Sequence, residues 1–294
     1  MRVSLLHNSH SGSKDHTADE VAATIRRFGH EVVGVAHSLA ELGAALERSE
    51  PELIAIAGGD GTVSRTACAL AGSPIPLAIL PHGTANNTAL ALGIQNPLEE
   101  IVDSWRRARE RPFDLIEFTV DGHTTYCAEA VGWGVFPQVI ARARQDQGCE
   151  SAPRSLDAER ALFRECAEAA ESRDYEVTLD GVSHSGSFCL VEICNLRFIG
   201  PQLLLSPAST PDDGRLEVIL WDSARREHLD RMLEAKPDLR RVNAAASALS
   251  GERIRVRASD ARRHVDGHLL ELGGPAERTV EFSVRRAAVH YWVA

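Results

Sequence analysis

The feature that most constrains the fold is a glycine-rich turn that follows a short apolar segment. Residues 53–57 (Leu-Ile-Ala-Ile-Ala) come after Pro51 and lead into residues 58–62 (Gly-Gly-Asp-Gly-Thr). A short apolar run between breakers predicts a buried parallel strand, and residues 62–70 have the spacing of a helix. A glycine-rich turn between a strand and a helix start presents backbone N–H groups to an anion, so this segment predicts a phosphate site.

Asp60 lies inside this turn, where a bare carboxylate would repel a bound phosphate. A Mg²⁺ ion, or a water bound to one, between the two groups would remove the conflict. The same strand, turn and helix could also be purely structural, because glycine pairs are common at turns.

A similar arrangement occurs at two other places in the first part of the chain. The apolar run 76–80 leads into residues 81–87 (Pro-His-Gly-Thr-Ala-Asn-Asn), and the run 3–6 leads into small polar residues at 8–14. In an open parallel sheet, loops at the carboxyl ends of the strands form the ligand crevice. We therefore expect the three polar loops to converge on one crevice.

The pattern of the chain changes near Phe113. Before this residue, strands and helices alternate, ending with an expected helix over 97–110, which predicts a doubly wound parallel sheet. After it, strands are joined by turns such as Asp121-Gly122 and Asp180-Gly181, which predict antiparallel hairpins, and a polar helix is expected over 155–172. Because 294 residues exceed the usual size of a single core, we expect two domains.

Composition excludes several classes of protein. The formal net charge of −10 argues against a nucleic-acid partner, because phosphate backbones are bound by basic surfaces. The six cysteines show no metal-binding spacing, so reduced thiols are expected. The sequence shows neither a secretory signal peptide nor an apolar run of about eighteen residues, so we expect a cytoplasmic protein.

Five blocks of sequence occur in a recognisable order. They are residues 8–12 (Asn-Ser-His-Ser-Gly), 58–62, 81–87, the segment 206–218 with Ser206-Pro207-Ala208 and Asp212-Asp213-Gly214, and residues 265–267 (Val-Asp-Gly). Together they resemble the diacylglycerol kinase catalytic family, which includes bacterial lipid kinases, sphingosine kinases and ceramide kinases. The resemblance covers essentially the whole chain. The block at 58–62 also occurs in NAD kinases, but the order of the blocks is that of the lipid kinases.

The resemblance implies the fold of NAD kinases and diacylglycerol kinases. An N-terminal doubly wound, three-layer α/β domain at 1–118 would bind the nucleotide, and a C-terminal antiparallel β-sandwich at 119–294 would bind the acceptor. The last segment, about 288–294, could return to the first domain. The implied activity is an ATP- and Mg²⁺-dependent kinase that phosphorylates a lipid alcohol such as diacylglycerol, a sphingoid base or ceramide.

The resemblance also implies roles for residues at the matching positions. The ATP site would be formed by residues of the three polar loops: Asn8, Ser11, Gly58, Gly59, Gly61, Thr62, Gly83, Thr84 and Asn86. Asp60 would act in catalysis through Mg²⁺. Asp212 and Asp213 would belong to a second metal network, although Asp-Asp-Gly is also a favourable turn sequence.

The late block departs from the family at one position. The family has Asp-Gly-Glu, with the glutamate as the expected base, whereas this chain has Asp266, Gly267 and His268. A neutral imidazole can accept a hydroxyl proton near neutral pH, so His268 and Asp266 are the candidate catalytic residues here. Three alternatives stay open: Glu271 could be the base, the chain could bind nucleotide without transferring phosphate, or the acceptor could be a less hydrophobic alcohol.

A lipid acceptor would also determine where the protein works. We expect a transient contact with the inner face of the membrane, since the acceptor must be taken from there. No nucleic acid partner is expected, and the sequence leaves a homodimer open.

Overall fold

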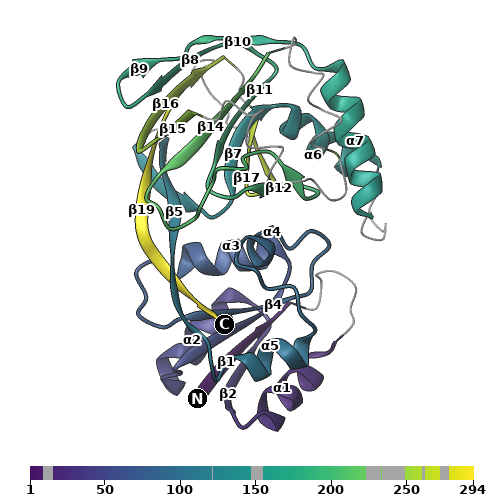
Figure 1. The fold of residues 1–294 in the computed structure, drawn as a ribbon, viewed down its shortest axis with the longest axis vertical. Coiled ribbons are helices and arrows are strands. Elements are labelled where there is room, and N and C mark those ends of the chain that lie inside the picture. The colour runs from purple at the N-terminus through teal and green to yellow at the C-terminus, as the bar shows by residue number, and fades with distance from the viewer. Residues whose placement is uncertain are drawn as a thin grey trace. The chain divides into compact units, whose positions relative to one another are not determined.

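The computed structural model describes residues 1–8, 16–120, 122–146, 155–222, 233, 249–259, 262–271 and 278–294 (Figure 1). The chain divides into two compact units: unit 1 comprises Met1–Phe113 and Arg286–Ala294, and unit 2 comprises Asp114–Arg285. Strands β5 (Arg109–Val120) and β19 (Arg278–Val293) are each divided by the boundary between the units. Every helix in the described part of the chain is too short or too polar to cross a membrane.

Unit 1 is built on a parallel sheet in the order β4-β3-β1-β2. Its strands are β1 (Arg2–His7), β2 (Glu31–Ala36), β3 (Leu53–Gly58) and β4 (Leu77–Pro81). Its helices are α1 (Ala18–Arg27), α2 (Leu39–Ser49), α3 (Asp60–Ala69), α4 (Asn87–Ala91) and α5 (Leu98–Ser104). The chain passes from β1 to β2 on one side and then to β3 on the other side of β1. The topological switch point, where such sheets bind ligands, therefore lies between β1 and β3.

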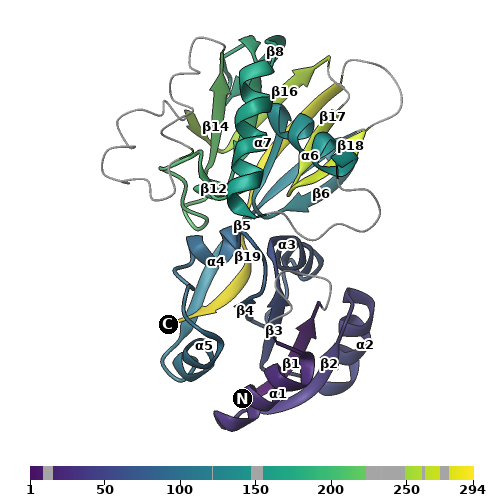
Figure 2. The ribbon, with the colours of Figure 1, turned by 90° about the vertical axis from the view of Figure 1, so that its right-hand side faces the viewer.

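Helices cover both faces of this sheet. On one face, a core cluster joins β1, β3 and β4 to α1 and α5, with Leu5, Ala55 and Ile25 fully buried in it. On the other face, α2 lies close to β2. A Cβ added at Gly34 of β2 would be only 3.6 Å from the Cβ of Ala45 in α2. This arrangement confirms the predicted doubly wound sheet, which Figure 2 shows from a second direction.

Unit 2 contains two antiparallel sheets that share one apolar core. The first consists of the unit 2 parts of β5 and β19 together with β6 (His123–Cys127), β8 (Arg173–Leu179), β9 (Val182–Ser183), β10 (Gly186–Phe188) and β16 (Arg253–Ala258). The second has the order β15 (Leu249–Gly251), β14 (Leu216–Trp221), β11 (Leu190–Cys194), β7 (Ala130–Gly134), β17 (Arg262–Val265) and β18 (His268–Glu271). Buried side chains from both sheets, such as Val177 and Ile193, belong to one cluster, which confirms the β-sandwich.

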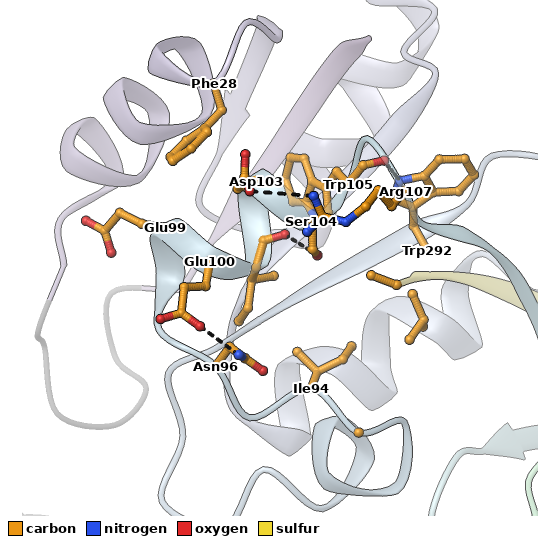
Figure 3. Close-up of a pocket in the computed structure, with 14 residues that line it drawn as sticks. Phe28, Ile94, Asn96, Glu99, Glu100, Asp103, Ser104, Trp105, Arg107 and Trp292 are labelled. Carbon is orange, nitrogen blue, oxygen red and sulfur yellow. Dashed lines mark hydrogen bonds and ion pairs between the residues drawn. The ribbon is translucent and has the colours of Figure 1, made fainter.

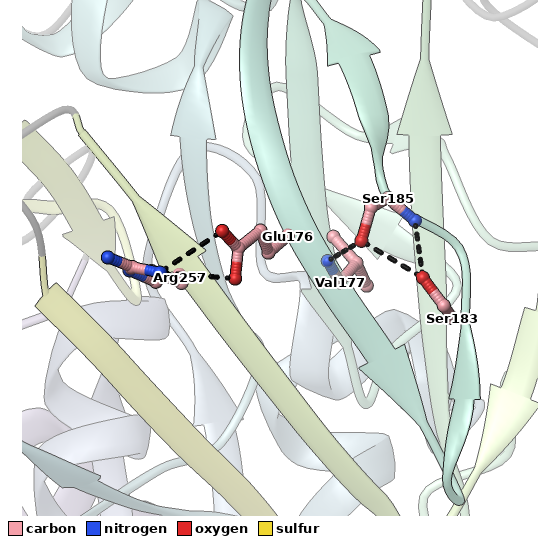
Figure 4. Close-up of polar contacts among 5 residues, drawn as sticks. All are labelled: Glu176, Val177, Ser183, Ser185 and Arg257. Carbon is pink, nitrogen blue, oxygen red and sulfur yellow. Dashed lines mark hydrogen bonds and ion pairs between the residues drawn. The ribbon is translucent and has the colours of Figure 1, made fainter.

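Two helices and a short strand pair complete unit 2. Helix α6 (Val135–Asp146) packs on β7, β17 and β18 of the second sheet, and helix α7 (Leu156–Ala169) packs on α6 (Figure 1). The strands β12 (Phe198–Ile199) and β13 (Leu203–Leu204) form a separate pair. The outer face of the first sheet is polar: Arg257 pairs with Glu176 across strands at 3.1 Å, and the Ser185 hydroxyl accepts the N–H of Val177 (Figure 4).

The structure corrects the sequence interpretation in two places. The helix predicted over 97–110 ends at Ser104, and β5 begins at Arg109, because the segment that starts there pairs with β19 and β6 in the sheet. Helix α6 was not predicted at all. The helix predicted over 155–172 is confirmed as α7, whose N-terminus is capped by the Ser155 hydroxyl.

Candidate active site

The first and second polar loops are joined at the switch point of unit 1. Asn8 follows β1 directly, and its side-chain Nδ2 donates to Oγ1 of Thr62 at 2.8 Å, while its backbone N–H donates to the carbonyl of Ala57 at 3.0 Å. Thr62 is almost fully buried in the first turn of α3. Its hydroxyl, which accepts from Asn8, can still donate its own hydrogen. The sequence therefore brings Asn8 and Thr62 together as predicted for one ligand site.

Glycines let the second and third loops touch backbone to backbone. A Cβ added at Gly83 would lie 2.6 Å from the Cα of Gly59, and one added at Gly58 would lie 2.7 Å from the side chain of Thr62. The carbonyl of Gly58 also accepts the N–H of His82 at 3.0 Å. Because a Cβ does not fit at these positions, the loops require glycine for close approach rather than for an unusual φ.

Asp60 is the first residue of α3 and lies beside the third loop. Its Oδ1 accepts the backbone N–H of Thr88 in α4 at 3.2 Å, and Gly59 is the N-cap of α3. Asp60 is half-buried, as is Gly61, whereas Thr84 is exposed. The carboxylate therefore stands at the N-terminus of α3 and contacts the first turn of α4.

Asn86 has a structural role that was not predicted. It adopts a left-handed conformation with φ 53°. Its side-chain amide makes two hydrogen bonds to the backbone of Gly83: Oδ1 accepts the N–H at 2.8 Å, and Nδ2 donates to the carbonyl at 2.7 Å. The N–H of Gly83, which was predicted to hold a phosphate, is thus engaged within its own turn. Ser11 lies outside the described residues.

Sequence reasoning missed a group of histidines beside these loops: His7, His16, His37 and His82. The ring centroid of His7 lies 6.2 Å from that of His37 and 6.3 Å from that of His82. The ring centroids of His16 and His82 are 5.7 Å apart. Three of the rings donate an N–H to a backbone carbonyl, which fixes their tautomers. No group of three or more His, Cys, Asp or Glu in the described ranges is arranged to hold a metal ion. The sequence carried no signal for this group, because its members come from different segments of the chain.

The acidic pair of unit 2 forms a turn. Asp213 accepts the N–H of Arg215 at 2.9 Å through one oxygen and the Thr210 hydroxyl at 2.7 Å through the other. Asp212 is exposed. Buried Asp114 also stabilises the turn, because its Oδ2 accepts the N–H of Gly214 at 2.8 Å. The metal role of Asp212 and Asp213 stays a prediction.

Asp266 and His268 belong to a tight hairpin between β17 and β18. Asp266 and Gly267 have φ values of 46° and 73°, and Val265 pairs with His268 across the turn. The Asp266 carboxylate accepts three backbone N–H groups, from Ala128 at 2.9 Å, Glu129 at 2.8 Å and Ala130 at 3.2 Å. His268 is exposed at the start of β18. The structure therefore gives Asp266 a holding function, and it leaves the His268 side chain accessible.

A second feature missed from the sequence is a buried, hydrogen-bonded pair of polar side chains on β11 and β17. Glu192 Oε1 and His264 Nε2 lie 2.6 Å apart, and both side chains are almost fully buried. Burial raises the pKa of Glu192, and the adjacent His264 opposes this shift. A lone glutamate in an apolar strand was the only signal in the sequence.

The predicted site residues do not line the cavity of about 510 Å³ in unit 1, which is shown in Figure 3. Its walls come from α5, the segment before it at 93–96, the end of α1 and the end of β19, and include Phe28, Glu99, Glu100, Asp103, Trp105 and Trp292. The three carboxylates already have nearby partners. The cavity is thus distinct from the candidate phosphate site.

The chain matches two described protein families. Residues 2–118 match the family "Diacylglycerol kinase catalytic domain", and residues 139–285 match the "YegS C-terminal NAD kinase beta sandwich-like domain". A diacylglycerol kinase of Mycobacterium tuberculosis strain H37Rv is 28% identical over 234 residues, covering 75% of this chain and 72% of that protein. A "Probable lipid kinase YegS-like" of Stenotrophomonas maltophilia is 30% identical over 175 residues, covering 57% and 55%.

A solved structure has the same fold along the whole chain. The crystal structure of a diacylglycerol kinase from Bacillus anthracis str. Sterne has a TM-score of 0.73 and 17% identity, and the match covers 100% of this chain and 97% of that one. The two family matches account for both the nucleotide-loop blocks and the sandwich. The chain therefore belongs to the diacylglycerol kinase catalytic family, and it is an enzyme of the lipid kinase class, a phosphotransferase with an alcohol group as acceptor.

Proposed function

We propose that this enzyme transfers the γ-phosphoryl group of ATP, with Mg²⁺, to the hydroxyl of a lipid alcohol. The observation that carries the proposal is the pair of glycine turns in unit 1, which meet at Gly59 and Gly83 beside the carboxylate of Asp60. Diacylglycerol is the first candidate acceptor, since it is the substrate in the name of the M. tuberculosis relative. A sphingoid base and ceramide are the other candidates.

The loops of unit 1 would bind and orient the phosphates. The N–H groups at Gly59 and Gly61, the start of α3 and the hydroxyls of Thr62 and Thr84 offer donors to phosphate oxygens. Asn8 would hold Thr62 in position through the 2.8 Å hydrogen bond. The bond between Asn86 and Gly83 would keep the third loop close enough to Gly59 for both turns to contact one ligand.

The residues present fit a Mg²⁺ ion that arrives with the nucleotide. Mg²⁺ usually takes one or two carboxylates together with phosphate oxygens and waters, so a preformed cluster of three side chains is not needed. Asp60 would hold the ion, with Asp212 and Asp213 as the proposed residues of a second metal network. Bound there, the ion would offset the negative charge of the transferring group.

We assign the proton-accepting role to His268. As the acceptor oxygen forms its bond to the γ-phosphorus, the bond from phosphorus to the β-phosphate oxygen breaks, ADP leaves, and the hydroxyl proton passes to the imidazole. His268 is exposed and stands next to Asp266, whose carboxylate is engaged with three backbone N–H groups. This makes Asp266 better suited to hold the turn than to accept the proton. The acceptor would be taken from the inner face of the membrane by transient contact.

The test is transfer of label from γ-labelled ATP, with Mg²⁺, to diacylglycerol, sphingosine or ceramide in mixed micelles. We expect an organic-phase product that Asp60→Ala and His268→Ala each abolish. A labelled product in the aqueous phase would indicate a less hydrophobic alcohol. ATP binding without any labelled product would refute the kinase proposal and favour a nucleotide-binding regulator. The replacement of the family's glutamate by His268 would then explain why no phosphoryl group is transferred.

A further inference from the structure

The hairpin that carries His268 has a short backbone connection to its sheet. Strand β17 pairs with β7 through two residue pairs in the described ranges, His264 with Gly132 and Val265 with Val131, and the N–H of Asp266 in the turn donates to the carbonyl of Ala130 at 3.0 Å. Strand β18 pairs with β17 and ends the sheet order. A short ladder at an edge opens easily, because few hydrogen bonds must break. Side chains must therefore contribute to fixing where His268 stands.

One row of residues crosses three strands at this ladder. Gly132 of β7 is paired with Glu192 of β11 on one side and with His264 of β17 on the other. Residues paired across strands point to the same face of a sheet. Val191 and Ile193 lie in the sandwich core, so Glu192 between them points to the opposite face, which α6 covers. The row therefore lies beneath α6.

The absence of a side chain at Gly132 is what lets its two neighbours meet. The Glu192 carboxylate extends over Gly132 to reach the His264 ring at 2.6 Å, and a Cβ added at Gly132 would overlap Oε2 of Glu192. Gly132 does not have a positive φ, so its conformation does not require glycine. The space taken by the carboxylate is the reason for glycine at this position.

The pair is closed off from water and from other partners. Glu192 has no exposed surface, and His264 is packed under Phe136 of α6, with ring centroids 5.2 Å apart. Among the described residues, Oε2 of Glu192 and Nδ1 of His264 have no hydrogen-bond partner. A buried polar pair of this kind adds little to stability, but it favours one geometry over its alternatives.

We infer that Glu192, Gly132 and His264 are positioning residues for the turn that carries His268, acting together with Asp266. The row fixes β17 against β7 from the α6 side, and the Asp266 carboxylate fixes the turn to residues 128–130. The two devices hold the end of the hairpin at two points. This inference deepens the proposed function and rests on it for the role of His268.

The test compares Gly132→Ala with Gly43→Ala, a matched control in α2 whose added Cβ would meet nothing within 4 Å. Hydrogen exchange of residues 262–271 reports the hairpin without any assay of activity, and kinetics report the reaction. In Gly132→Ala we expect exchange to be faster by about tenfold. We expect kcat to fall by on the order of 100-fold, with KM for ATP unchanged, as for a displacement of about 1 Å at a reacting group.

A second variant removes the pair without leaving a buried unpaired charge. Glu192→Leu combined with His264→Leu should keep the free energy of unfolding, because apolar replacement of a buried pair is often neutral, yet lose the same share of kcat. Unchanged exchange in Gly132→Ala, or full kcat in the double variant of an active enzyme, would overturn the inference. If the wild type phosphorylates no alcohol, the proposed function fails, and the exchange measurement alone then decides whether the row holds the hairpin.

Discussion

Replacing Gly83 by alanine should separate the two glycine turns of unit 1. A Cβ at this position would lie 2.6 Å from the Cα of Gly59 and 2.7 Å from Oδ1 of Asn86. Carbon atoms in contact prefer about 3.5 to 4.0 Å, so the backbone at Gly59 must retreat by roughly 1 Å. Asn86 could rotate away, but Gly83 would then lose both hydrogen bonds to it.

Two magnitudes follow from this displacement. Forcing a methyl group into a filled space costs about 1–3 kcal/mol, so the free energy of unfolding should fall by that amount. Gly59 is the N-cap of α3 and precedes Asp60, so its retreat moves the predicted phosphate donors. A shift of about 1 Å at a reacting centre lowers the rate on the order of 100-fold.

Urea unfolding, calorimetric titration with ATP and the phosphoryl-transfer assay measure the three effects. We expect weaker ATP binding and slower transfer in Gly83→Ala, with Gly43→Ala as the control that changes neither. A Gly83→Ala protein that unfolds like the wild type and binds ATP with unchanged affinity would refute the argument. It would show that contact between the two turns does not shape the nucleotide site.

Three further predictions concern stability. Asp266→Asn can keep the left-handed turn, but its amide NH₂ would face a backbone N–H group that the carboxylate now accepts. The free energy of unfolding in urea should therefore fall by about 1.5–3 kcal/mol. An unchanged midpoint would contradict the role of Asp266 in holding the turn. Burial raises the pKa of Glu217, so the folded state binds its proton more tightly than the unfolded state, and stability falls as pH rises from about 4.3 through the higher folded pKa. Glu217→Gln should therefore reduce this fall, and parallel curves for the two proteins would be the contrary result. Trp292→Phe removes the 3.0 Å bond from Nε1 to the carbonyl of Trp105 and should cost about 1 kcal/mol in the same assay, which an unaltered unfolding curve would disprove.

The parts of the fold that the sequence predicted are those with local signals. Apolar runs bounded by glycine and proline gave β3 and β4, and the Asp180-Gly181 pair gave the hairpin of β8 and β9, whose φ values of 46° and 85° match the turn type expected for that sequence. Helix α6 lacked such a signal, because it begins at Val135 directly after β7 without a capping residue. The helix predicted over 97–110 was too long, since residues 106–111, five of them charged, are compatible with either state, and the pairing of β5 with the distant strand β19 decides between them.

The residues of the candidate site also differ in whether the sequence could predict their contacts. Asn8, Thr62 and the glycines could be grouped because parallel strands place their carboxyl ends at one edge, which needs no knowledge of register. The link between Glu192 and His264 depends on which residues of β11, β7 and β17 are paired. Those strands are far apart in the sequence, and a shift of one residue would turn either side chain to the other face of the sheet. Such pairs become visible only when the register is known.

The late Asp-Gly block shows why a motif position does not by itself name a chemical role. Asp266 accepts the backbone N–H groups of residues 128–130 and also adopts a left-handed turn conformation, and either role alone would favour Asp or Asn over larger residues. The residue two positions later has a different place, since His268 is exposed and is the first residue of β18. A change from the family's glutamate to histidine at that position leaves the three hydrogen bonds of Asp266 in place. Its consequences must appear in the reaction, and above all in the pH dependence of kcat, because an imidazole and a carboxylate lose their protons in different pH ranges.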